Sequence, residues 1–202
     1  IGIIGKNGTG KSTFLNLVTG TLPLDSGRVV IGETIKVGYY TQSGINPKPG
    51  QRVIDVIKEY GEFIPLMKGR LISASQLLER FLFDSKKQYD FVDRLSGGEL
   101  KRLYLCTVLI QNPNFLILDE PTAALDPIAE AEIYSRFGQI VTDKTAVYIS
   151  HRLSSCRFCD EILVFDEGHI VEKGTHEELV SAGGKYAELW NAQAQYYTDT
   201  TT

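Results

Sequence analysis

A cluster of glycines followed by a lysine and a serine stands near the start of the chain. It reads Gly5-Lys6-Asn7-Gly8-Thr9-Gly10-Lys11-Ser12 and matches the P-loop pattern of Gly, four residues and then Gly-Lys-Ser. Glycines let backbone N–H groups turn toward a phosphate, the lysine can reach the β- and γ-phosphates, and the serine hydroxyl can ligate Mg²⁺. Nucleotide contacts are therefore expected from the loop and the helix after it: Gly5, Asn7, Gly8, Gly10, Lys11, Ser12 and Thr13.

Two carboxylates follow a second apolar run, residues 115–118. If this run is a strand of the same parallel sheet, Asp119 and Glu120 emerge at the same sheet edge as the P-loop. Asp119 would then hold the Mg²⁺ shell, directly or through water, and Glu120 would act as the general base that orients and polarises the attacking water. The alternatives without chemistry are an acidic strand end facing solvent and a glycine-rich turn without a ligand.

The strands that must position these residues are indicated by short apolar runs in the sequence. Such runs cover residues 1–4, 115–118, 146–149 and 162–165, which is typical of strands buried on both faces of a parallel sheet. Helical patterns separate several of them. The sequence therefore predicts an α/β fold of the P-loop NTPase type, with a mainly parallel sheet flanked by helices and the ligand at the carboxyl ends of the strands.

The middle and the end of the chain have other patterns. A loop at residues 46–50 precedes helical stretches near 53–60 and 75–83, so we predict a helical subdomain at residues 43–110, inserted between core segments 1–42 and 111–202. Residues 161–165 and 169–172 flank an Asp-Glu-Gly turn and predict a hairpin. One last helix is expected over about residues 177–195.

Composition limits the functions that fit. The chain has 202 residues, 43% hydrophobic and 23% charged, with a formal net charge of -4, so we expect one globular domain and no direct binding of nucleic acid. No apolar stretch approaches the roughly 20 residues of a membrane span, and any membrane role is expected to come through a partner. Three cysteines, Cys106, Cys156 and Cys159, fit a reducing compartment, and we expect a cytoplasmic location.

A third motif indicates which class of P-loop NTPase the chain resembles. Leu95-Ser96-Gly97-Gly98-Glu99 has Ser and Glu at the spacing of a helix capping box, and it resembles the signature motif of ABC-type ATPases. Further positions resemble that family's Q-loop, D-loop turn and switch histidine, in the same order: Gln42, Asp126 and His151. The resemblance covers nearly the whole chain.

This resemblance implies a head-to-tail dimer with a second copy or a related ABC domain. ATP would lie between one P-loop and the other subunit's signature residues Ser96, Gly97 and Gly98. Gln42 would sense Mg²⁺ and the water, His151 would contact the γ-phosphate, and Asp126 would link the two sites. Together with Glu120 and Lys11, Gln42 and His151 form the expected catalytic set.

The resemblance also implies that ABC-type domains carry antiparallel strands and an adenine-stacking aromatic residue upstream of the P-loop. This chain begins at Ile1, inside the expected first strand, so we expect a single ABC ATP-binding domain, residues 1–202, without that upstream part.

Two subfamilies are combined here. Residues 1–120 resemble ABC-F proteins, which act on ribosomes, whereas the chain from Pro121 onward resembles ABC exporters. The chain departs from both patterns. An ABC-F protein is expected to carry Asn-Asp or Asn-His before the Leu-Asp of the turn and an acidic residue where Arg152 stands, and an exporter is expected to carry a glutamate and glycine-rich loop where residues 86–93 stand. We expect an ATPase that drives a transporter. The alternatives are a ribosome-associated ABC-F-like ATPase and a truncated or recombined nucleotide-binding fold without turnover.

Overall fold

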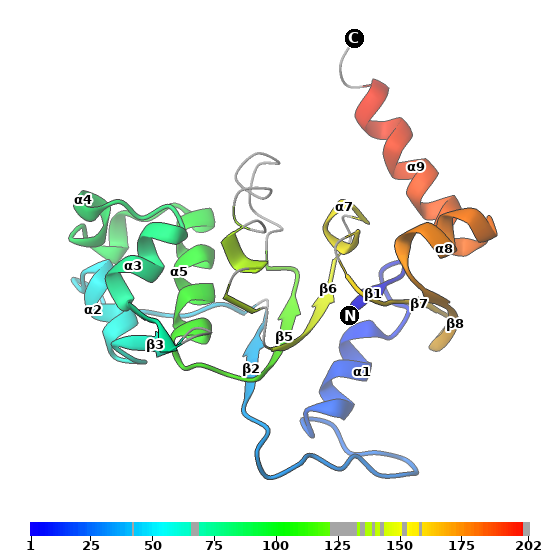
Figure 1. Ribbon diagram of the computed structural model, residues 1–202, viewed down its shortest axis with the longest axis horizontal. Coiled ribbons are helices and arrows are strands. Elements are labelled where there is room, and N and C mark those ends of the chain that lie inside the picture. The colour runs from blue at the N-terminus through cyan, green and yellow to red at the C-terminus, as the bar shows by residue number, and fades with distance from the viewer. Residues whose placement is uncertain are drawn as a thin grey trace. The chain divides into compact units, whose positions relative to one another are not determined.

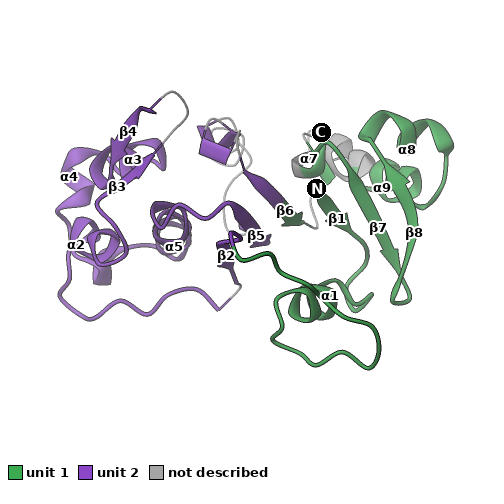
Figure 2. Ribbon diagram, turned by 60° about the horizontal axis from the view of Figure 1, so that its bottom comes forward, with its two compact units in different colours: residues 1–33, 147–202 green, residues 34–146 purple. Residues whose placement is uncertain are grey.

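The computed structural model describes residues 1–41, 43–65, 69–121, 133, 136–138, 140–141, 144–150, 153–157 and 159–199. It is a mixed α/β structure (Figure 1). The chain divides into two compact units, one formed by residues 1–33 and 147–202 and the other by residues 34–146 (Figure 2). Each unit has its own strands, helices and core.

The first unit contains a mainly parallel group of strands. Its order is β6-β1-β7-β8, where β1 is Gly2–Ile4, β6 is Thr145–Ile149 (its residues 147–149 lie in this unit), β7 is Ile162–Asp166 and β8 is His169–Gly174. β1 runs parallel to both neighbours, and β8 pairs antiparallel with β7. The predicted parallel strands and the predicted hairpin are both confirmed.

Helices α1 (Lys11–Val18), α7 (Leu153–Cys156), α8 (His176–Ala182) and α9 (Lys185–Asp199) complete this unit. Strands and helices share one buried cluster, formed by Ile4, Leu153, Cys156, Ile162, Val164, Leu179 and Tyr186. Ile4 is the last residue of β1 and directly precedes the P-loop. The core of the unit therefore fixes the point at which the glycine-rich loop begins.

The prediction of one continuous last helix is wrong. Helix α8 ends before Gly183, whose backbone is left-handed with φ 66°, and α9 begins two residues after this glycine. The carboxylate of Glu172 in β8 accepts hydrogen bonds from the backbone N–H groups of Lys185 and Tyr186, at 2.6 and 2.9 Å. A residue from the hairpin thus satisfies the first turn of α9, and the two helices can diverge.

The second unit pairs β2 (Val37–Tyr40) in parallel with β5 (Phe115–Asp119). Between residues 43 and 110 its described helices are α2 (Val53–Lys58), α3 (Ala74–Arg80), α4 (Ser85–Gln88) and α5 (Gly97–Ile110), with a 3-10 turn at Val92–Arg94. A small hairpin of β3 (Phe63–Pro65) and β4 (Leu71–Ser73) was not predicted. The four helices lie within residues 43–110, and the boundaries of the helical subdomain stay a prediction.

The stacked rings of Tyr40 and Tyr104, 4.6 Å apart, pack α5 against β2. Tyr40 is fully buried, together with Ile57, Leu77 and Leu103 from the helices and Phe81 directly after α3. Because Tyr40 is the last residue of β2, this packing sets the start of the segment that leads to Gln42.

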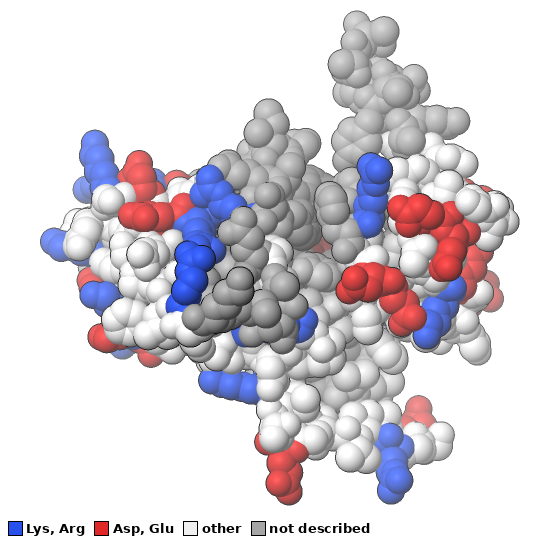
Figure 3. Space-filling model, in the orientation of Figure 1, with Lys and Arg blue, Asp and Glu red and all other residues white. Residues whose placement is uncertain are grey.

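The distribution of surface charge and the length of the helices are relevant to charged partners and to the membrane. On the face shown in Figure 3, basic side chains gather around α3 and α5 and acidic ones near α8, whose first turn holds Glu177 and Glu178. The described part of this face therefore carries both signs instead of one broad field. None of the helices in the described ranges has the length and apolar character needed to cross a membrane.

Candidate functional site

The P-loop in the first unit adopts a shape that only glycine allows at two points. A Cβ on Gly5 would lie 2.4 Å from the carbonyl oxygen of Phe165 and 2.8 Å from the Thr9 hydroxyl, closer than any side chain can approach. Gly10 caps α1 in a left-handed conformation with φ 97°. The loop is thus closed tightly against β7 at its start and turned sharply into α1 at its end.

Lys11 lies inside this loop. Its side chain is buried, with 6% of its surface exposed, and its ammonium donates hydrogen bonds to the carbonyl oxygens of Gly5 at 2.7 Å and Lys6 at 2.8 Å. The positive charge is therefore held against the backbone of the loop. The N-terminus of α1 adds its partial positive charge at the same place.

The remaining predicted contacts lie at the surface of the loop and the first turn of α1. Asn7, Gly8, Ser12 and Thr13 are exposed, so backbone N–H groups and the two hydroxyls are accessible to a ligand. The arrangement fits a phosphate chain, because a buried cation faces a rim of exposed donors.

Thr9 was missed by sequence reasoning, because the P-loop pattern treats its position as variable. Its buried hydroxyl donates to the carbonyl oxygen of Lys6 at 2.9 Å, and its own carbonyl accepts from the N–H of Gly168 at 3.1 Å. Thr9 therefore braces the loop internally and ties it to the turn between β7 and β8. A buried polar residue between two loop glycines is the only signal that the sequence offers for this role.

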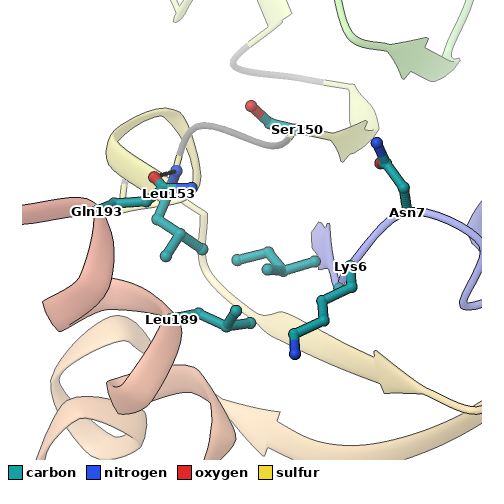
Figure 4. Close-up of a pocket in the computed structure, with 8 residues that line it drawn as sticks. Lys6, Asn7, Ser150, Leu153, Leu189 and Gln193 are labelled. Carbon is teal, nitrogen blue, oxygen red and sulfur yellow. Dashed lines mark hydrogen bonds between the residues drawn. The ribbon is translucent and has the colours of Figure 1, made fainter. Parts of the chain in front are cut away.

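A pocket of about 340 Å³ opens beside the P-loop within the first unit. Figure 4 shows Leu153, Leu189 and Gln193 on one side of it and Lys6 and Asn7 on the other. The side-chain oxygen of Gln193 accepts a hydrogen bond from the N–H of Leu153 at 3.0 Å. Helix α9 thus holds the start of α7, directly after the segment that contains His151.

Asp119 and Glu120 lie in the second unit, at the carboxyl end of β5. Asp119 ends the strand and is buried, with 6% of its surface exposed. Burial raises the pKa of Tyr39 on the neighbouring strand β2, and the negative charge of Asp119 raises it further. Glu120 has a left-handed backbone with φ 52°, a conformation that costs energy in a residue with a side chain.

The signature segment forms the N-terminus of α5, as its capping-box spacing predicts. The hydroxyl of Ser96 accepts from the N–H of Glu99 at 3.3 Å, and the N–H of Ser96 donates to the Glu99 carboxylate at 2.7 Å. Gly97 and Gly98 form the first turn without side chains. A ligand can therefore approach the N–H groups at the start of this 14-residue helix closely.

The structure thus places the P-loop in the first unit, and the two carboxylates and the signature in the second. The predicted residues Gln42, Asp126 and His151 lie outside the described residues, so their roles stay predictions.

Comparison with known proteins identifies the family. The family model described as ABC transporter matches residues 1–123 of the 202. The chain belongs to the ABC transporter family. The matched residues of this ABC transporter chain include the P-loop, the signature and both carboxylates.

Three named relatives are similar to most of this chain. The chain is 42% identical over 178 residues to the ABC transporter ATP-binding protein YfmR of Bacillus subtilis, covering 86% of this chain and 27% of that protein. It is 34% identical over 207 residues to ABC transporter B family member 24, mitochondrial, of Arabidopsis thaliana, covering 96% and 30%. It is 32% identical over 209 residues to the ATP-dependent lipid A-core flippase of Haemophilus ducreyi, covering 96% and 36%. The ABC transporter chain thus spans about a third of the length of these relatives.

A solved structure is similar as well. The structure of a bacterial Atm1-family ABC exporter with ATP bound matches 96% of this chain and 36% of that one, with a TM-score of 0.80 and 27% identity. This neighbour confirms the predicted fold class. The comparisons show homology to the nucleotide-binding part of ABC exporters, and they give no support to the resemblance of residues 1–120 to ABC-F proteins.

Proposed function

We propose that this chain binds MgATP on its P-loop and hydrolyses it to ADP and phosphate as one half of a dimer, and that this reaction drives conformational change in an exporter. The observation that carries the proposal is the preformed P-loop, in which the buried ammonium of Lys11 lies at hydrogen-bond distance from the Gly5 and Lys6 carbonyls. An exporter with ATP bound is among the structural neighbours.

In this proposal the phosphate chain lies over the P-loop. Backbone N–H groups from the loop donate to phosphate oxygens, and Lys11 turns from the Gly5 and Lys6 carbonyls toward the β- and γ-phosphates. Phosphate oxygens are negatively charged, so they attract the ammonium more strongly than a neutral carbonyl oxygen does.

Oxygen atoms supply the proposed Mg²⁺ ligands. The hydroxyl of Ser12, the carboxylate of Asp119 and the side-chain oxygen of Gln42 are of the hard type that Mg²⁺ prefers. Bound Mg²⁺ neutralises part of the phosphate charge. Glu120 takes a proton from the attacking water as general base, and His151 contacts the γ-phosphate.

The dimer supplies the second side of each site. Ser96, Gly97 and Gly98 would face the nucleotide on the P-loop of another subunit, where the N-terminus of α5 favours negative charge. Asp126 would connect the two sites. Loss of the γ-phosphate would then weaken the dimer, which is how hydrolysis could be converted into movement.

The proposed partner is a transmembrane part of an exporter, with this chain at the cytoplasmic face of the membrane. Its support is the flippase and exporter relatives. These relatives do not favour the ribosome-associated alternative. A nucleotide-binding fold without turnover is the outcome that the experiment below must exclude.

The test is steady-state hydrolysis of MgATP as a function of protein concentration, with Glu120→Gln as the matched variant. A rate per mole of protein that rises with concentration, and that falls about 10²- to 10⁴-fold in Glu120→Gln, is expected for a dimeric ATPase with Glu120 as base. Nucleotide binding by Glu120→Gln should be unchanged. If the unsubstituted chain and the variant hydrolyse ATP equally slowly, the chain binds nucleotide without catalysis.

A further inference from the structure

A lysine outside the signature segment forms an ion pair with Glu99, the residue that completes the capping box of α5. In the second unit, the ammonium of Lys87 in α4 lies 3.1 Å from Oε1 of Glu99, and its distance to Asp90 Oδ2 is longer, 4.0 Å. The other oxygen of Glu99, Oε2, accepts from the N–H of Ser96 at 2.7 Å. One carboxylate therefore joins Lys87 to the residue that begins α5.

The Glu99 carboxylate is held in its charged form. Burial alone would raise its pKa, but the N–H and hydroxyl of Ser96 and the ammonium of Lys87 outweigh burial, and the pKa lies below its usual value. The side chains of Lys87 and Glu99 are 30% and 21% exposed, so water screens this pair only in part.

Helix α4 presents Lys87 from a fixed position. The side chain of Asp84 caps the helix by accepting from the N–H of Lys87 at 2.7 Å. Gln88 on the same helix is buried, accepts a hydrogen bond from the hydroxyl of Ser75 at 2.7 Å and donates one to the carbonyl of Phe83 at 3.0 Å. A helix anchored at both ends can transmit its position through a side chain.

We propose that Lys87 is a positioning residue for the signature: through the Glu99 carboxylate it fixes the orientation in which Ser96 meets a nucleotide held by a second subunit. The inference rests on the proposed function of Ser96. Helix α4, anchored by Asp84 and Gln88, is the support from which Lys87 acts.

The test compares Lys87→Met with Lys86→Met. Lys86 is the exposed neighbour on the same helix, and both substitutions remove one positive charge. We expect Lys87→Met to lower the rate of MgATP hydrolysis at low ionic strength about two- to five-fold, the range of a partly exposed ion pair. ATP binding to the P-loop, measured by calorimetric titration, should be unchanged, Lys86→Met should behave like the unsubstituted chain, and Lys87→Arg should retain the rate.

A double-mutant cycle with Glu99→Gln identifies the partner. Glutamine keeps an acceptor for the N–H of Ser96 but carries no charge. Lys87→Met should therefore have no further effect in the Glu99→Gln background. An equal loss in both backgrounds, or an equal loss in Lys86→Met, would overturn the proposal.

A second measurement does not depend on turnover. The pKa of the Glu99 carboxyl, followed by NMR titration, should rise in Lys87→Met and stay unchanged in Lys86→Met. The absence of that rise would overturn the proposal even in a chain that does not hydrolyse ATP. If the pKa rises but the unsubstituted chain shows no hydrolysis, the proposed function fails instead, and the role of Lys87 is confined to the signature's structure.

Discussion

The buried ammonium of Lys11 donates a hydrogen bond to the carbonyl oxygen of Gly5 at 2.7 Å. The loop thus places its own cation at its centre before any phosphate arrives. A ligand with negative oxygens replaces neutral carbonyl partners and does not have to recruit a side chain from solvent.

The first prediction concerns that cation. Lys11→Ala should weaken ATP binding about 10- to 100-fold, because hydrogen bonds to charged groups contribute about 1.5–3 kcal/mol. Lys6→Ala removes the same charge from an exposed side chain of the same loop and should change the affinity less than about threefold. Calorimetric titration measures both. Equal losses would mean that net charge, and not the position of Lys11, determines binding.

Thr9→Val should weaken the loop itself. The hydroxyl that braces the Lys6 carbonyl is lost while the side-chain shape is kept, so we expect the free energy of unfolding to fall by about 0.5–1.5 kcal/mol and ATP affinity to fall with it. Urea unfolding measures the first quantity and titration the second. Thr9→Ser retains the hydroxyl and serves as the control, and a similar loss in Thr9→Ser would assign the effect to the missing methyl group.

Glu120 combines a proposed catalytic role with a strained backbone, and the two can be separated. Glu120→Gly should raise the thermal midpoint of unfolding, because glycine relieves a left-handed conformation that costs about 1–2 kcal/mol, while it abolishes turnover. Glu120→Gln should lower turnover about 10²- to 10⁴-fold without this gain in stability. Calorimetric melting of the two variants is the measurement, and equal melting temperatures would contradict strain at this position.

Two glycines of the second unit should respond to alanine in opposite directions. A Cβ at Gly38 would lie 2.6 Å from Cγ of Pro113, and a proline ring cannot move aside, so Gly38→Ala should lower the free energy of unfolding by about 1–3 kcal/mol. Gly138 is helical, and a Cβ built on it meets no atom of the described residues within 4 Å, so Gly138→Ala should raise the free energy of unfolding by up to about 1 kcal/mol. Chemical unfolding of both variants checks the pair, and a stabilising Gly38→Ala would show that β2 and β5 can separate at this point.

Local patterns in the sequence account for the strands, the P-loop and the cap of α5. Buried apolar runs, glycines at fixed spacing and a Ser-x-x-Glu box are each encoded within a few neighbouring residues. The hairpin of β3 and β4 was not predicted, because each strand has only three residues and so few residues give no periodic signal.

The features that were not predicted are contacts between residues of different secondary-structure elements. The break between α8 and α9 is stabilised by Glu172 from a strand, and the Lys87–Glu99 ion pair joins two helices. Spacing in one sequence does not reveal such pairs, because a charged residue at the surface has many partners within reach.

The contacts of the P-loop with Phe165 and Gly168 also bear on the order of biosynthesis. The loop is translated long before the backbone against which Gly5 closes and the N–H that holds Thr9. A nascent or shortened chain that stops before β7 contains every residue of the nucleotide motif and lacks the surface that gives it shape.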